Sequence, residues 1–295
     1  MPAARQLSAL DVSPGKAGAF CVYHDESGTD TTHDRFQLHG ALLVDRAHWP
    51  QALEALAGAR GGYDGRIHFV DLRDNARSPK AKVAAEWVRL YFGDLSRYCA
   101  YKCMIADTQA PGFNAARFPK PFHLYNHTAL LAIFGGIIWS LKPYDEVELA
   151  LFSESITRPA DDPFAVYLPR ELARRSRRRK PGAGPRIRVS AASVALVPGD
   201  PRQIAPELRG HCEFIQLTDL ITGAVAQALN AQASQRVKLD LGAIAAGWIE
   251  DSRRPPWHQQ HDLHRRFSVS CYPDAKGGFY DVPLGIAGRG QMRLF

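Results

Sequence analysis

Three acidic residues that lie far apart in the chain, Asp25, Glu154 and Asp219, occupy positions from which they could bind a divalent cation. If their elements pack together, the three carboxylates repel one another unless cations neutralise them. Mg²⁺ and Mn²⁺ accept all-oxygen ligands, and a pair of ions about 4 Å apart could activate water and stabilise the leaving oxygen in phosphodiester cleavage. The three acids therefore predict an Mg²⁺ or Mn²⁺ cofactor and hydrolysis of phosphodiester bonds.

Asp25 and Glu26 follow residues 20–24, an apolar run rich in β-branched and aromatic residues that predicts a buried strand. A strand that ends on acids places charge at the rim of a sheet, where ligands of α/β proteins bind. Adjacent strand residues point to opposite faces, so the two acids share a site only if the chain already turns at Ser27 and Gly28. The alternative is an ordinary polar turn after a strand.

Glu154 repeats this pattern, because it also stands at the end of a strand-like run. Asp219 lies in a predicted amphipathic helix, on one face with Gln216 and Gly223. Glycine in a helix interior costs about 1 kcal/mol relative to alanine, so Gly223 indicates close approach by backbone or a ligand. A solvated aspartate on an ordinary surface helix is the alternative for Asp219.

Histidine and serine chemistry are weaker alternatives. His68 lies in a short extended piece, residues 63–71, and could orient water or contact a phosphate beside a metal, although a structural or surface histidine is the alternative. Ser27 and Ser153 lie near acids, but no G-x-S-x-G motif surrounds either serine. The chain also has no glycine-rich phosphate loop of P-loop or Rossmann form.

A basic cluster is the densest charge in the chain, with six cations within seven residues and two more shortly after. Such cations repel one another without anions, so a phosphate backbone is a natural counter-charge. A solvated, mobile loop is the alternative, favoured by the Pro- and Gly-rich segment 181–185. The predicted nucleic-acid-binding residues are Arg174, Arg175, Arg177, Arg178, Arg179, Lys180, Arg186 and Arg188.

Strands and helices alternate along the chain after an opening hairpin. We expect one α/β domain over residues 18–272, with a mixed sheet, an antiparallel opening hairpin, flanking helices and C-terminal helical additions; residues 1–17 and 273–295 are tails. The predicted strands are 20–26, 36–44, 98–107, 146–152, 187–197 and 267–272. The predicted helices are 49–59, 79–97, 122–141, 164–180, 213–230 and 237–250.

Composition excludes a disordered chain, with 45% hydrophobic and 23% charged residues. The formal charge of +7 suits a polyanionic partner, and a modest excess of this size is also common on proteins that bind none. Five cysteines form no C-x-x-C pair and predict buried thiols in a reducing compartment. The most apolar window, 128–141, is too short to cross a bilayer, and the N-terminus lacks a signal-peptide core. We therefore expect a cytoplasmic protein without a membrane partner.

The order and spacing of these motifs resemble the family known as domain of unknown function 3800, over roughly residues 20–230. The resemblance implies a ribonuclease H-like fold, in which acids at two strand ends and on a late helix hold divalent metal. Asp25, with Glu26, and Asp219 match the first and last of these roles. The matching segments are Asp25–Gly28, the strand 36–44, Ile67–Phe69 and Gln216–Gly223.

The chain departs from this family where an aspartate is expected to end the middle strand, since Ser153-Glu154 stands there. Either Glu154 reaches the site with its longer side chain, or the site is incomplete. Two functions follow: a metal-dependent nuclease, or a non-catalytic nucleic-acid-binding or assembly module of a mobile-element or bacterial defence system, with a protein partner. In the first, Glu26 and His68 join the catalytic residues, and Ser27, Gln216 and Gly223 support them.

Overall fold

The computed structural model describes residues 16–28, 35–73, 75–180, 182–230, 233–254, 263–281 and 284–285. Its strands are β1 Ala17–Ser27, β2 Phe36–Asp45, β3 Cys99–Asp107, β4 Glu146–Glu154, β5 Arg186–Val189, β6 Ala195–Val197 and β7 Phe267–Tyr272. They form one seven-stranded sheet in the order β5-β4-β1-β2-β3-β7, and β6 pairs with the end of β4. The central strand β1 therefore has β4 on one side and β2 on the other.

Strand direction makes the sheet mixed, as predicted. β1, β2 and β3 pair antiparallel, whereas β4 runs parallel to β1 and β5 runs parallel to β4. The predicted α/β fold with an antiparallel opening hairpin is thus confirmed. One predicted strand, 187–197, is wrong as a single element, because residues 190–193 are exposed and the run divides into β5 and β6.

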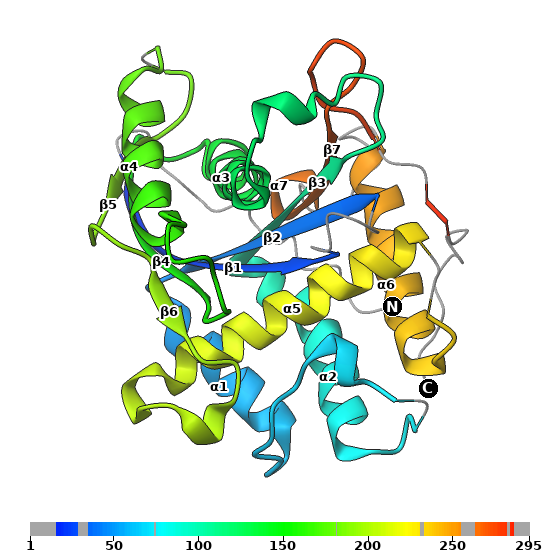
Figure 1. Cartoon of the computed structure of the whole chain (residues 1–295). Helices are drawn as coiled ribbons and strands as arrows, with labels where there is room; N and C mark the ends of the chain where they lie inside the picture. The colour runs from blue at the N-terminus through cyan, green and yellow to red at the C-terminus, as the bar shows by residue number, and fades with distance from the viewer. Residues whose placement is uncertain are drawn as a thin grey trace.

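Helices cover both faces of the sheet (Figure 1). The helices α1, α2, α5 and α6 pack on one face, and α3 and α4 pack on the other. The predicted helix 79–97 begins as expected, because the Ser78 side chain accepts a hydrogen bond from the Ala81 N–H, but it ends at Phe92 before Gly93. The helices are α1 Trp49–Arg60, α2 Pro79–Phe92, α3 Pro121–Ser140, α4 Phe164–Arg177, α5 Arg209–Asn230, α6 Arg236–Arg253 and α7 Leu263–Arg266.

The two layers of the core follow from the alternation of side chains along β1. Phe20 and Val22 pack in the layer of α3 and α4, whereas Cys21 and Tyr23 pack in the layer of α5. Because side chains alternate along a strand, Asp25 belongs to the α5 face. The alternation of side chains along β1 thus places Asp25 on the face of the sheet that α5 covers.

Helix α5 lies directly against β2 at Gly40, the residue that pairs with Asp25 across the hairpin. A Cβ atom at Gly40 would overlap Thr222 Oγ1, so only glycine permits this approach. Asp219 lies three residues before Thr222, on the same side of the helix. This contact therefore brings Asp219 toward the end of β1.

All five cysteines are buried and free, in agreement with the predicted thiols. Of the helices in the described ranges, none combines the length and apolarity needed to cross a bilayer.

Candidate active site: an acid-lined cleft

A cleft of about 1140 Å³ opens at the ends of β1 and β4, beside α5. Five acids line this cavity, which we call the acid cleft: Asp25, Glu26, Glu154, Asp200 and Asp219. The three acids that the sequence expected to meet therefore line one cavity. Ligand pockets for small molecules usually measure about 300–1000 Å³, so the acid cleft has room for a larger ligand.

The acid cleft opens where β1 extends beyond the last residue that it pairs with β4. That pairing ends at His24 and Ser153, whereas pairing with β2 continues to Ser27. The expectation that the chain must turn for Asp25 and Glu26 to share a site is wrong, since both lie within β1. They point to opposite faces, yet both reach the cleft because it opens at the unpaired edge of the strand.

Asp25 is buried, with 2% of its surface exposed, and its Oδ2 atom has no hydrogen-bond partner among the described residues. Burial raises the pKa of this carboxyl well above its usual value, and the charges of Asp219, Glu26 and Glu154 raise it further. A buried carboxyl in this state must hold a proton or meet a cation. Asp25 therefore has one buried carboxylate oxygen available to a proton or a cation.

Asp219 is buried too, so the alternative of a solvated surface aspartate is wrong. Its Oδ2 atom accepts a hydrogen bond from the Phe69 N–H at 2.6 Å, and its Oδ1 atom lies 3.3 Å from His68 Nε2. Burial raises the pKa of Asp219 to about 8, and Glu154 adds to the shift. The close approach predicted at Gly223 is made by the Phe69 ring, which a Cβ atom there would overlap.

Gln216 holds the loop that carries His68. Its Oε1 atom accepts from the Ile67 N–H at 2.8 Å, and its Nε2 atom donates to the Gly199 carbonyl at 3.1 Å. The predicted extended piece is instead an irregular loop that ends in a short 3₁₀ turn, Phe69–Asp71. Burial lowers the pKa of His68 to about 4, so the imidazole is neutral at pH 7.

Glu26 faces the α3 layer, where Tyr125 Oη donates a hydrogen bond to its carboxylate at 2.6 Å. Arg158 Nη2 in turn donates to Tyr125 Oη at 2.8 Å. Burial raises the pKa of Glu26 to about 7, while Tyr125 and Arg158 oppose the shift. The sequence prediction missed both partners; a tyrosine inside the apolar helix 122–141 was the only local signal.

Glu154 makes an ion pair with Arg66, whose Nη2 atom lies 2.7 Å from Glu154 Oε1. The sequence analysis did not predict this ion pair. Gly199 permits this contact, since a Cβ atom there would overlap Glu154 Oε1. Ser27 lines the acid cleft at the end of β1.

Ser153, the other serine near an acid, contacts His24 in a buried network. His24 Nδ1 lies 3.0 Å from Ser153 Oγ, and His24 Nε2 lies 3.0 Å from His39 Nδ1. All three side chains are buried and none of them lines the acid cleft. This network is therefore structural.

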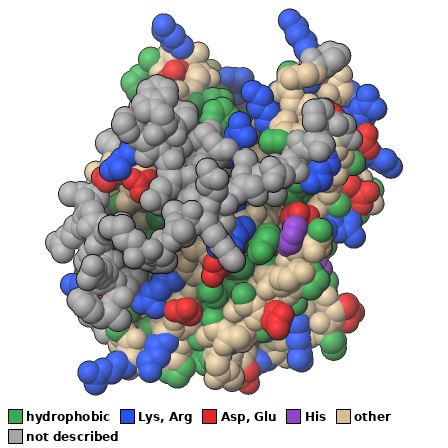
Figure 2. Space-filling model, turned by 180° about the vertical axis from the view of Figure 1, so that it is seen from behind, with side chains coloured by type: hydrophobic (Ala, Val, Ile, Leu, Met, Phe, Trp, Pro, Cys, Tyr) green, Lys and Arg blue, Asp and Glu red, His purple; other side chains and the backbone are tan. Residues whose placement is uncertain are grey.

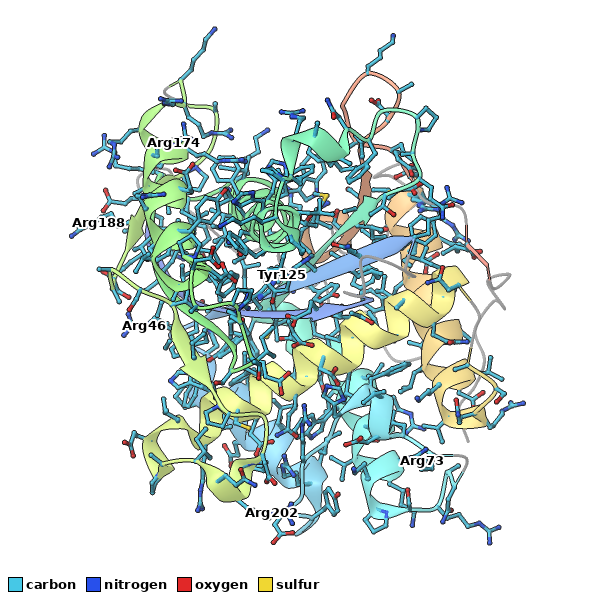
Figure 3. The ribbon with its side chains drawn as sticks, in the orientation of Figure 1. Arg46, Arg73, Tyr125, Arg174, Arg188 and Arg202 are labelled. Carbon is cyan, nitrogen blue, oxygen red and sulfur yellow. The ribbon has the colours of Figure 1, made fainter. Side chains whose placement is uncertain are left out.

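The predicted basic cluster lies away from the acid cleft. In the sheet, Arg186 of β5 is the strand partner of Glu146, the first residue of β4. Glu154 is the last residue of β4, and a strand rises about 3.3 Å per residue, so the two ends of β4 are about 26 Å apart. In Figure 3, Arg174 and Arg188 lie at the outer edge beside α4 and β5, apart from Tyr125 at the centre. Seen from behind, Lys and Arg side chains gather at the upper right (Figure 2).

A groove of about 730 Å³, here called the basic groove, is lined by several of these cations. Not every cation is available, because Arg174 pairs with Glu171, and the guanidinium groups of Arg175 and Arg179 lie over the Phe134 ring. Arg188 lies 3.3 Å from Glu146. Arg177, Arg178, Lys180 and Arg186 are exposed.

The acids fit a divalent cation by their chemistry, since they offer only oxygen atoms, one of them without a partner. Within the described ranges, no three His, Cys, Asp or Glu side chains are arranged as a ready metal site. Two of the acids are engaged in this state, Glu154 by Arg66 and Asp219 by the Phe69 N–H.

No model of a known protein family matches the chain, and no curated protein is significantly similar to it.

Proposed function

We propose that this protein is a divalent-metal-dependent nuclease that cleaves phosphodiester bonds in the acid cleft. The observation that carries the proposal is the burial of Asp25, Glu154 and Asp219 in the lining of one cleft, which is costly unless protons or cations neutralise them. These three residues would hold Mg²⁺ or Mn²⁺. Such an ion, when bound, makes water a nucleophile at neutral pH and stabilises charge on the leaving oxygen.

The positions of the acids support a ribonuclease H-like active site. Asp25 lies at the end of β1, Glu154 ends β4, and Asp219 lies on the late helix α5. The resemblance to the domain of unknown function 3800 family implies this same distribution. Glutamate in place of aspartate at position 154 is accommodated by Gly199, which leaves room for the longer side chain.

The remaining residues of the acid cleft have separate roles in this proposal. Glu26, with a pKa of about 7, can take up or release a proton near neutral pH, and Tyr125 orients it. His68, which is neutral, lies against Asp219 and helps to orient that carboxylate. Arg66 and Lys238 line the cleft and supply positive charge for a phosphate backbone.

Cleavage of labelled DNA and RNA, single- and double-stranded, with Mg²⁺ or Mn²⁺ tests the proposal. We expect cleavage that EDTA abolishes, and loss of cleavage and of tight Mn²⁺ binding in Asp25→Asn. Asp94→Asn is the matched control, because the Asp94 side chain is 77% exposed and outside the cleft. Equal activity in Asp25→Asn and the parent protein would reject the assignment.

A non-catalytic nucleic-acid-binding or assembly module is the second candidate, favoured by the Arg66–Glu154 ion pair that engages one of the three acids. It predicts that the parent protein binds nucleic acid without cleaving it, and that Asp219→Ala binds equally well. Cleavage by the parent protein that disappears in Asp219→Ala would exclude this candidate.

A further inference from the structure

Arg66 reaches into the acid cleft and contacts Glu154. The guanidinium uses Nη2 for this ion pair, and its Nε atom is buried without a hydrogen-bond partner among the described residues. About a third of the side chain, 36%, remains exposed. Arg66 is thus a cation held at a carboxylate that a divalent ion would also require.

The backbone beside Arg66 is fixed on α5, next to the other acids. Ile67 N–H donates to Gln216 at 2.8 Å, and Phe69 N–H donates to Asp219 at 2.6 Å. The arginine side chain, in contrast, has several rotatable bonds and can change its partner without moving the loop. Release of Glu154 by Arg66 therefore requires no rearrangement of the fold.

Both side chains lie against Gly199, whose added Cβ atom would overlap Glu154 Oε1 and lie 3.1 Å from Arg66 Nε. The ion pair is therefore packed against bare backbone, close to the cleft. A metal ion that reaches Glu154 Oε1 meets the guanidinium at the same oxygen, and the two cations repel each other.

We propose that Arg66 neutralises Glu154 while the cleft is empty and is displaced when a divalent ion binds, after which its guanidinium binds a phosphate oxygen of the substrate. This inference rests on the proposed function, because it assigns to Arg66 a place in the same site. Arg66 is then both a competitor of the metal and a substrate-binding residue. A planar guanidinium with several N–H donors suits phosphate oxygens.

Mn²⁺ binding by calorimetry at pH 8, in protein stripped of metal, tests the competition. Arg66→Gln should bind Mn²⁺ about tenfold more tightly than the parent protein, since a charged competitor is removed. Arg202→Gln is the matched control. Arg202 lies on the 3₁₀ turn Pro201–Gln203 and forms an ion pair with Asp200 in the cleft lining. The substitution therefore removes one positive charge but leaves the Arg66–Glu154 ion pair in place.

Equal Mn²⁺ affinity in Arg66→Gln and the parent protein would overturn the competition while leaving the metal site intact. The same gain in Mn²⁺ affinity in Arg202→Gln would also overturn it, because the gain would then follow from the loss of any nearby positive charge. Absence of Mn²⁺ binding in parent and variant would instead overturn the proposed function itself. Binding in Arg66→Gln alone would support the displacement.

Cleavage at saturating Mn²⁺ tests the second role of Arg66. Arg66→Gln should lose at least about tenfold in kcat/KM, and Arg66→Lys should recover part of this loss because it restores the charge. Unchanged kcat/KM in Arg66→Gln would overturn the substrate contact, whatever the result of the binding experiment.

Discussion

Asp219 Oδ2 accepts a hydrogen bond from the Phe69 N–H at 2.6 Å, although the two residues are 150 positions apart in the chain. Together with the bond from the Ile67 N–H to Gln216, it joins α5 to the loop that carries Arg66 and His68. It also satisfies one oxygen of a carboxylate whose pKa is raised by burial and by the charges of Glu154 and Asp71. The geometry of the acid cleft therefore depends on how closely α5 and this loop approach.

Replacement of Asp219 by Asn should change the pH dependence of stability. The folded-state pKa of Asp219 is about 8, above its usual 3.8, so its stabilising contribution is complete below about pH 4 and is lost as pH rises through 8. Asp219→Asn avoids this loss while keeping an oxygen acceptor for Phe69. Thermal unfolding in EDTA should show the variant gaining on the parent between pH 5 and 9, by on the order of 3 kcal/mol.

Asp94→Asn should show no such trend, because its side chain is 77% exposed. Addition of Mg²⁺ at pH 8 should raise the melting temperature of the parent protein more than that of Asp219→Asn, since metal binding needs the ionised carboxylate. A difference between variant and parent that stays constant with pH would contradict the assigned pKa.

Gly223→Ala should destabilise the protein, although alanine is the better helix former. A Cβ atom at position 223 would overlap the Phe69 ring and force the loop away from α5. We expect a loss of about 1–3 kcal/mol in the free energy of unfolding, measured by urea denaturation. Gly247→Ala in α6 is the matched control, because its Cβ atom meets nothing within 4 Å; it should gain up to about 1 kcal/mol. Equal effects would contradict the close contact.

Tyr125→Phe should move the pH dependence of cleavage upward. The Tyr125 hydrogen bond lowers the pKa of Glu26, so its loss raises that pKa above about 7, and Glu26 becomes ionised only at higher pH. The acidic limb of the pH–rate profile should shift by roughly one pH unit. Tyr144→Phe, which lies beside Phe20 outside the cleft, should leave the profile unchanged. A uniform loss of rate at every pH would contradict a role through Glu26.

Charge reversal in the basic groove should affect long nucleic acids and spare short ones. About 26 Å of β4 separates the two ends, and a duplex advances about 3.4 Å per base pair, so only sites of roughly eight base pairs or more reach both. Arg177→Glu with Arg186→Glu, both in the lining of the basic groove, should weaken binding of long duplexes and flatten its salt dependence. Lys82→Glu with Arg89→Glu, exposed on α2, is the control. Equal weakening for short duplexes would contradict a separate groove.

Local sequence patterns determined most elements of the fold. Alternation and apolar runs predicted β1, β2, β3, β4 and β7, and helical periodicity predicted α5 with Asp219 and Gln216 on one face. These predictions succeed because strand and helix periods depend on neighbours in sequence. The sequence did not predict the division of 187–197 into β5 and β6, because this division depends on pairing with β4 rather than on local propensity.

The residue types of the site were readable in the sequence, but their partners were not. That Asp25, Glu154 and Asp219 are acids at element ends is a local fact. Only the tertiary structure decided that Arg66 contacts Glu154 and that Tyr125 contacts Glu26. It also decided that the basic groove lies at the opposite end of β4 from the acid cleft. Such contacts join segments many residues apart, so they depend on strand order and on the close packing of α5 at Gly40, which no local pattern encodes.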